Sequence, residues 1–227
     1  MEVAAGMSIA PAITLAERVA PRPGTQLELY REDGPLVRLV GVALGRRIPV
    51  RPLVLAVIGA AGLFAAIAVE GDGASDGVVA AAVAWFVLWA GLSAGRPHTD
   101  EFAWALPGVL RIGEYGALIW IGAIVGESGS AAAFALIAAL AFRHYDLVYR
   151  SRIQGTPPAA WLDVATGGWD ARMPLAVALL ALGAVPEAFF AIAAVLGLVL
   201  VADSVRSWAR HTAAPVSVYE DEEDEGD

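Results

Sequence analysis

The stretch Pro52–Val69 reads PLVLAVIGAAGLFAAIAV and contains no charged residue, and the same holds for Gly77–Gly95, which reads GVVAAAVAWFVLWAGLSAG. Each run has 18 or more residues, which as an α-helix is enough to cross about 30 Å of hydrocarbon. An amphipathic helix of a soluble protein would show a polar stripe, and neither run has one. The two runs therefore predict an all-α protein that crosses a membrane several times.

The composition of the chain agrees with a membrane protein. Of its 227 residues, 58% are hydrophobic and 17% are charged, against about 25% charged in ordinary soluble domains. The chain has no cysteine, which excludes a disulfide framework and a thiolate metal site. All 15 basic residues are arginine, and the heavy use of Ala, Gly, Val and Arg indicates a bacterial source with a GC-rich genome.

The formal net charge of −9 at pH 7 comes mostly from one end of the chain. The last eight residues, Glu220–Asp227, hold seven acids and no base, and such a block is typical of a disordered, solvated tail. The rest of the chain is close to neutral and has no basic surface interleaved with aromatic residues. We therefore expect an acidic tail over 213–227 and no nucleic-acid partner.

We expect two further parts before this tail: a cytoplasmic N-terminal extension over 1–34 and a transmembrane helical domain over 35–212. The domain begins with a helix from Pro35 to Arg47 that mixes apolar residues with arginines. This helix either lies at the membrane interface or packs on the bundle as a cytosolic helix. About six spanning helices follow, and the fifth is short, with 14 uncharged residues from Met173 to Pro186. The expected spans are 52–69, 77–95, 107–126, 129–150 and a hairpin over 173–202.

The arginines predict the orientation of these spans. The loops expected on one side, 70–76, 126–130 and 185–187, contain five acids and no arginine, so every arginine falls on the other side. The positive-inside rule makes the arginine side cytoplasmic. We therefore expect a multi-pass protein of the bacterial cytoplasmic membrane with its N- and C-termini in the cytoplasm.

Four charges lie inside the apolar segments. Arg111 and Glu114 come early in the third span, and Arg143 and Asp146 come late in the fourth. A charge near the bilayer centre costs about 2.5–3.5 kcal/mol, so such residues usually face the interior of a bundle. Because the two spans are antiparallel, we expect Arg111 to lie level with Asp146 and Glu114 level with Arg143. Two ion pairs would then form just below the cytoplasmic surface.

Two hypotheses explain these charges. In the first, the protein is a transferase-like enzyme that handles a phosphate-bearing lipid or a CDP-linked headgroup, because arginine suits phosphate and carboxylates suit Mg²⁺. In the second, the charges are structural ion pairs of a non-catalytic membrane partner or scaffold for a lipid-synthesis enzyme. Under the first hypothesis the candidate catalytic residues are His144, Asp146 and Glu114, the candidate phosphate-binding residues are Arg111, Arg143, Arg150 and Arg172, and the candidate Mg²⁺ ligands are Glu114 and Asp146.

Two runs carry a resemblance to a known family. They are Phe142–Arg152, which reads FRHYDLVYRSR, and Gly168–Arg172, which reads GWDAR, with the segment RIGEY from Arg111 to Tyr115 upstream. Together they resemble an actinobacterial integral-membrane domain family of unknown function, over roughly residues 35–210. That domain is often found C-terminal to CDP-alcohol phosphatidyltransferase modules.

The resemblance implies a place in phospholipid headgroup or polar lipid synthesis. The implied partners are membrane lipids and a CDP-alcohol phosphatidyltransferase or another lipid-synthesis enzyme, and a homo-oligomer is compatible with them. The transferase's own signature, D-G-x2-A-R-x8-G-x3-D-x3-D, is not present, because Asp170-Ala171-Arg172 is followed by apolar sequence in place of the required aspartates. We therefore do not expect this chain to perform that transferase reaction itself.

Overall fold

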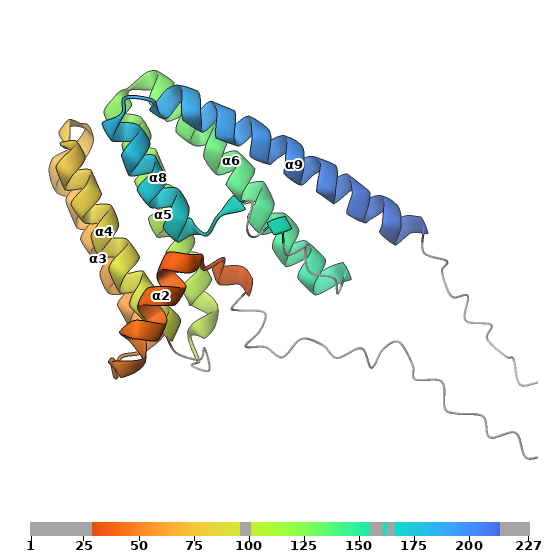
Figure 1. The fold of residues 1–227 in the computed structure, drawn as a ribbon, viewed down its shortest axis with the longest axis horizontal. Helices are drawn as coiled ribbons and strands as arrows, with labels where there is room; N and C mark the ends of the chain where they lie inside the picture. Colours follow the sequence, from red (N-terminus) through yellow and green to blue (C-terminus); the bar gives the residue numbers. More distant parts are fainter. Residues whose placement is uncertain (1–28, 96–100, 155–160, 163–165, 214–227) are drawn as a thin grey trace, which may run out of the picture.

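The computed structural model describes residues 29–95, 101–154, 161–162 and 166–213. The expected N-terminal extension up to residue 28 and the expected acidic tail from residue 214 onward lie outside the described residues. Within them the architecture is a bundle of α-helices, which confirms the predicted all-α polytopic class (Figure 1).

Five helices are long and apolar enough to cross a membrane. Where the sequence predicts the fifth span, the structure has the shorter helix α8 (Trp169–Ala181). It has 13 residues and so is about 20 Å long. It begins four residues earlier than the apolar run that starts at Met173, and it is too short to count among the five. The long helices are α3 (Pro52–Glu70), α4 (Asp76–Leu92), α5 (Leu106–Val125), α6 (Glu127–Tyr149) and α9 (Val185–Ala213).

Short helical segments complete the described chain. Helix α2 (Pro35–Ala43) precedes the first long helix, and the π-helical segment η6 (Arg150–Gln154) continues α6. Proline stands in the first turn of α2, α3 and α5, where its missing N–H costs nothing. The short 3-10 segments are η2 (Gly45–Arg47), η3 (Gly71–Gly73), η4 (Ser93–Gly95) and η5 (Ala103–Ala105).

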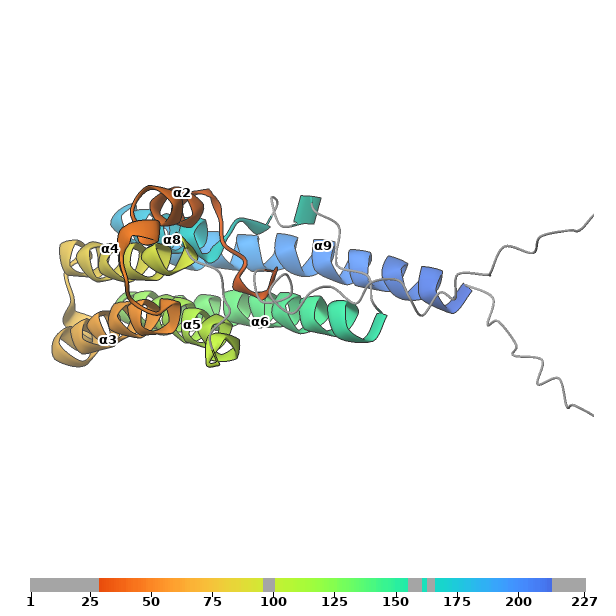
Figure 2. The same ribbon diagram turned by 90° about the horizontal axis from the view of Figure 1, so that it is seen from below.

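The long helices form two layers (Figure 2). One layer holds α3, α5 and α6, and the other holds α4, α8 and α9. Within and between the layers, α3 packs on α4, α5 on α6, and α6 on α9. Helix α9 has 29 residues, about 43 Å, and extends past the ends of its neighbours (Figure 1). Helix α2 lies across the outer side of the second layer, on α4 and α8.

The tight turns between long helices all lie at one end of the bundle (Figure 1). Glycines with positive φ end three of the helices: Gly71 (φ 58°), Gly126 (φ 98°) and Gly183 (φ 66°). Only glycine adopts this left-handed region without strain, which is why it commonly ends helices. Helix α2 and the connection that carries Arg46 lie toward the opposite end.

Small residues let the helices approach closely. A Cβ atom on Gly122 of α5 would lie 2.7 Å from the carbonyl oxygen of Gly129 in α6, so any larger residue would push these helices apart. Close approach through small residues is the usual way in which membrane helices associate. It lets α5 and α6, which both carry charged residues, pack directly on one another.

Candidate functional site: a buried ionic cluster

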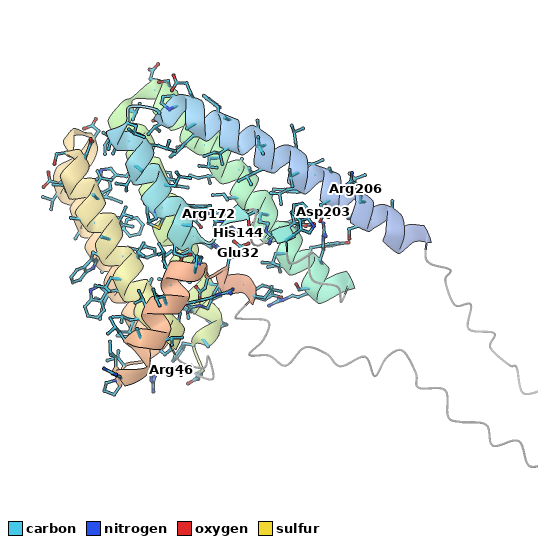
Figure 3. The ribbon with its side chains drawn as sticks, viewed as in Figure 1. Glu32, Arg46, His144, Arg172, Asp203 and Arg206 are labelled. Atoms are coloured by element: carbon cyan, nitrogen blue, oxygen red, sulfur yellow. The ribbon has the colours of Figure 1, made fainter. Side chains whose placement is uncertain are left out.

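Glu32, just before α2, is the centre of the site. Its carboxylate lies 2.9 Å from Arg111 Nη2, 3.2 Å from Arg143 Nε and 3.6 Å from Arg172 Nη2, and it hydrogen-bonds to His144 Nε2 at 2.8 Å. These partners come from α5, α6 and α8, so one carboxylate joins three helices that are distant in sequence. Figure 3 shows Glu32, His144 and Arg172 gathered where these helices meet α2.

Backbone geometry places Glu32 in this position. Its φ is 49°, a left-handed conformation that is uncommon for a residue with a side chain. Burial alone would raise the pKa of this carboxyl, but the hydrogen bond from His144 and the charges of Arg111 and Arg172 hold the pKa well below its ordinary value. Glu32 is therefore ionised throughout the neutral range.

Glu114 of α5 is the second acid of the site and is fully buried. Arg172 Nε donates to its Oε1 at 2.6 Å, and Arg111 Nη1 donates to its Oε2 at 3.1 Å. Arg172 also donates to the carbonyl oxygens of Thr166 and Gly167, at 3.1 and 2.6 Å. A buried charge is costly without partners. These bonds therefore explain how the first turn of α8 can hold Arg172 inside the bundle.

We call Glu32, Arg111, Glu114, Arg143, His144 and Arg172 the central cluster. His144 also contacts Tyr115, whose hydroxyl lies 2.5 Å from Nδ1, while Nε2 faces Glu32. The rings of Tyr115 and His144 are stacked with centroids 5.8 Å apart. Both ring nitrogens of the histidine are thus engaged within the protein, one by a phenol and one by a carboxylate.

The residues beside Glu32 fix the same segment to the bundle. Arg31 donates to Asp33 at 2.6 Å and to Ser93 Oγ at 3.1 Å, and Trp169 Nε1 donates to Asp33 at 3.2 Å. The backbone carbonyl of Tyr30 accepts from Arg111 at 2.9 Å. Residues 30–33 therefore contribute polar groups to the interior of the helical domain.

Asp170 connects α8 to α2. Its carboxylate is fully buried and accepts from the backbone N–H of Gly34 at 2.7 Å and of Val37 at 2.9 Å. These are amides at the N-terminus of α2, which has no side-chain cap of its own. An acid at this position satisfies free N–H groups and interacts favourably with the helix dipole. No side chain larger than hydrogen fits at Gly34 or Gly168, because the Asp170 carboxylate lies against both.

A second group of charges lies between α6 and α9, and we call it the α6–α9 cluster. Arg150 bonds to Asp146 at 2.9 Å and to Asp203 at 2.7 Å, and Ser204 donates to Asp146 at 3.2 Å. Asp203 is set apart from Glu32 and Arg172 along α9 in Figure 3. Two of the expected site residues, Asp146 and Arg150, therefore belong to this group and not to the central cluster.

The expected cross pairs between α5 and α6 were wrong. Glu114 pairs with Arg111 and Arg172, and Asp146 pairs with Arg150. Arg111 lies 15 residues before the turn at Gly126, whereas Asp146 lies 20 residues after it. The difference of five residues is about 7.5 Å along antiparallel helices, so the two are not level, and the same offset separates Glu114 from Arg143. The carboxylate that pairs with both Arg111 and Arg143 is that of Glu32, which belongs to neither helix.

Five of the seven candidate residues from the sequence lie together in the central cluster: Arg111, Glu114, Arg143, His144 and Arg172. The sequence analysis missed Glu32, Arg31 and Asp33, which it assigned to the extension, and the roles of Asp170 and Asp203. One signal was available for the first three: a charged run, Arg31-Glu32-Asp33, directly before a proline-initiated helix. Glu114 and Asp146 engage different partners, and within the described ranges no three His, Cys, Asp or Glu side chains are grouped as metal ligands would be.

The fold and the site define a class: an integral-membrane-type helical bundle with a buried ionic cluster near one end. Within that class, the chain belongs to a family of unknown function (DUF5941), whose model matches residues 22–225. The match includes the segment that carries Glu32. No curated protein and no solved structure matches the chain.

Proposed function

We propose that this protein is a non-catalytic membrane module that serves as a partner or scaffold for a lipid-synthesis enzyme. The observation that carries this proposal is that Glu32 and Glu114 form ion pairs with the arginine side chains of the central cluster. Glu114 and Arg143 are fully buried, and the side chains of Glu32 and Arg172 are 6% and 9% exposed. Two carboxylates of the chain thus face the three guanidinium groups of the central cluster.

A phosphate group would have to displace these carboxylates to reach the arginines. Charge-assisted hydrogen bonds in a buried site are strong, and breaking a buried ion pair costs about 3–5 kcal/mol. A ligand would therefore lose much of its binding energy in opening the cluster. The same bonds instead stabilise the attachment of residues 30–34 to the bundle, which is a structural role.

The partner follows from the resemblance, and not from the geometry. Neighbours in lipid synthesis, such as a CDP-alcohol phosphatidyltransferase, work in the membrane, where a second bundle can pack against lipid-facing helices. A homo-oligomer would use the same faces. The arginines at the end opposite the glycine turns support a cytoplasmic location for that end in a bacterial cell, and a chain oriented in this way would have its N- and C-termini on the cytoplasmic side.

The second candidate function is binding or transfer of a phosphate-bearing lipid or a CDP-linked headgroup. One observation favours it: the side chains of Arg111 and His144 are 13% and 16% exposed, the most open members of the central cluster. In this function Arg111, Arg143 and Arg172 would bind phosphate, joined by Arg150 from the α6–α9 cluster. His144, held by Tyr115 and Glu32, would be the base, and Glu114 or Asp146 would hold Mg²⁺.

One experiment separates the two functions. Purified wild-type protein, Arg172→Met and the control Glu70→Gln, at an exposed residue outside both clusters, are each titrated with CDP and with phosphatidic acid. Their unfolding temperatures are measured in parallel. The structural function predicts that Arg172→Met unfolds at a clearly lower temperature and that wild type binds CDP no better than this variant does. A wild type that binds CDP, together with a well-folded Arg172→Met that does not, would replace the structural function with the enzymatic one.

A further inference from the structure

Four arginines, one on α2 and three in the connection from α2 to α3, differ from those of the interior. Arg38, Arg46, Arg47 and Arg51 are all exposed, and none forms an ion pair with a residue that the structure describes. By contrast, arginines 31, 111, 150 and 172 of the interior, all less exposed than the four, have carboxylate partners. We call the four exposed residues the arginine rim. No acid lies between residues 34 and 69, so the rim is a concentrated positive charge.

The same element exposes apolar side chains. Helix α2 buries Val37 and Gly41 against the bundle, while Leu36, Leu39 and Val42 on its outer side are 45%, 67% and 59% exposed. Such a combination of an apolar outer face with flanking arginines is typical of helices that lie in a membrane surface. The structure shows that this helix packs on the bundle, and its apolar outer face is compatible with the interfacial placement that the sequence left open.

The depth of the rim follows from the helices that it joins. Helix α3 has 19 residues and α4 has 17, which gives lengths of about 28 and 26 Å, close to the hydrocarbon thickness of a bilayer. A Cβ atom on Gly45 would lie 3.3 Å from Gly95 Cα, just beyond the end of α4. The segment that carries Arg46 and Arg47 is therefore at the level where α4 ends and α3 begins, which is the headgroup layer. Figure 3 shows Arg46 at this end of the bundle.

Backbone groups add to the positive potential there. Helix α3 starts at Pro52 and its N-cap residue, Arg51, makes no side-chain capping bond. The N-terminus of a helix carries a partial positive charge and unpaired N–H groups. Arg51 thus stands at a helix N-terminus without a side-chain cap, and Arg46 and Arg47 precede it in the same connection.

We propose that the arginine rim binds anionic phospholipid headgroups, with the outer face of α2 inserted among the upper parts of the acyl chains. Guanidinium groups that have no acidic partner within the described residues match phosphate in charge and geometry. The apolar outer face of α2 would contact the acyl chains of a lipid, which free phosphate lacks, so the ligand is a phospholipid. This inference uses residues outside both ionic clusters, so it does not depend on the proposed function.

The test measures lipid retention by native mass spectrometry. Wild type, the triple variant Arg46→Gln/Arg47→Gln/Arg51→Gln, and a control with the same number of substitutions at acids of the opposite end, Glu70→Gln/Asp72→Asn/Asp76→Asn, are reconstituted in nanodiscs of phosphatidylglycerol and phosphatidylcholine. Each juxtamembrane basic residue contributes roughly five-fold to binding of anionic lipid, so three together contribute on the order of 100-fold. We expect the triple variant to lose its preference for phosphatidylglycerol while the control keeps it.

A further variant checks that charge carries the effect. Arg46→Lys/Arg47→Lys/Arg51→Lys should keep most of the preference, because lysine retains the charge but not the planar donor fork. The proposal is overturned if the glutamine triple variant retains phosphatidylglycerol as wild type does. It is also overturned if the opposite-end control loses the preference to the same extent, since the rim would then not be the binding surface.

Discussion

Replacing Glu32 by glutamine should destabilise the whole bundle, although the residue lies outside every long helix. The substitution keeps the size of the side chain and removes its charge. Arg111, Arg143 and Arg172 then lose the carboxylate that lies within 2.9–3.6 Å of each. Removing one partner of a buried ion pair costs about 3–5 kcal/mol, and Glu32 serves three such pairs, so we expect a loss in the upper part of this range.

The assay is thermal unfolding of the purified protein in detergent. For chains of this size, 1 kcal/mol shifts the unfolding temperature by about 2–4 °C, so a decrease of roughly 10–20 °C is expected. Glu70→Gln is the matched control, because Glu70 is exposed at the end of α3 and should shift the temperature by less than about 2 °C. If Glu32→Gln unfolds no earlier than Glu70→Gln, the central cluster does not stabilise the bundle as argued.

Three further predictions concern the Asp170 cap, the pH dependence of stability and the orientation in the membrane. Asp170→Asn should cost about 1–2 kcal/mol and speed amide exchange in the first turn of α2, measured by hydrogen–deuterium exchange; unchanged exchange would contradict the capping role. Because the folded pKa of Glu32 lies below its unfolded value of about 4.5, its contribution is present above that pH and is lost as pH falls below it. Unfolding temperature should therefore vary less between pH 7 and 5 than between pH 4.5 and 3, and the fall at low pH should be smaller in Glu32→Gln; an equal fall in both would refute the assignment. The chain has no cysteine, so the single variants Asp72→Cys and Arg47→Cys can each be labelled in cells with a membrane-impermeant maleimide. Only Asp72→Cys should react from outside the cell. Labelling of Arg47→Cys alone would show that the protein has the opposite orientation in the membrane.

The membrane-spanning helices were predictable because their signal is local. Runs such as Pro52–Val69 have no charge and reach the length of a bilayer, and glycines 71 and 126 end the helices close to where the apolar runs stop. The short helix α8 was harder to place. Its apolar run begins at Met173, but the helix starts at Trp169 because Asp170 and Arg172 find partners in the interior.

The central cluster was predictable only in part. Charges inside apolar helices, such as Arg111 and Arg143, are visible in sequence because they interrupt a hydrophobic run. Glu32 gives no such signal, because it lies in an irregular segment with no periodicity and reaches the cluster through a positive φ that sequence does not specify. The sequence analysis also mispredicted how deep the charges of α5 and α6 lie. Their distances from the turn at Gly126 differ by five residues, and this offset was enough to predict the wrong ion pairs.

A double-mutant cycle between Glu114 and Arg172 tests the central claim most directly, since Arg172 Nε and Glu114 Oε1 are 2.6 Å apart and both side chains are buried. Free energies of unfolding are measured for wild type, Glu114→Gln, Arg172→Met and the double variant. Residues in direct contact couple by about 0.5–3 kcal/mol, whereas independent sites add within about 0.5 kcal/mol. The structure predicts a coupling above about 1.5 kcal/mol, with the double variant more stable than the sum of the single losses implies. Additive losses would show that these charges do not hold one another, and the account of the cluster would be wrong.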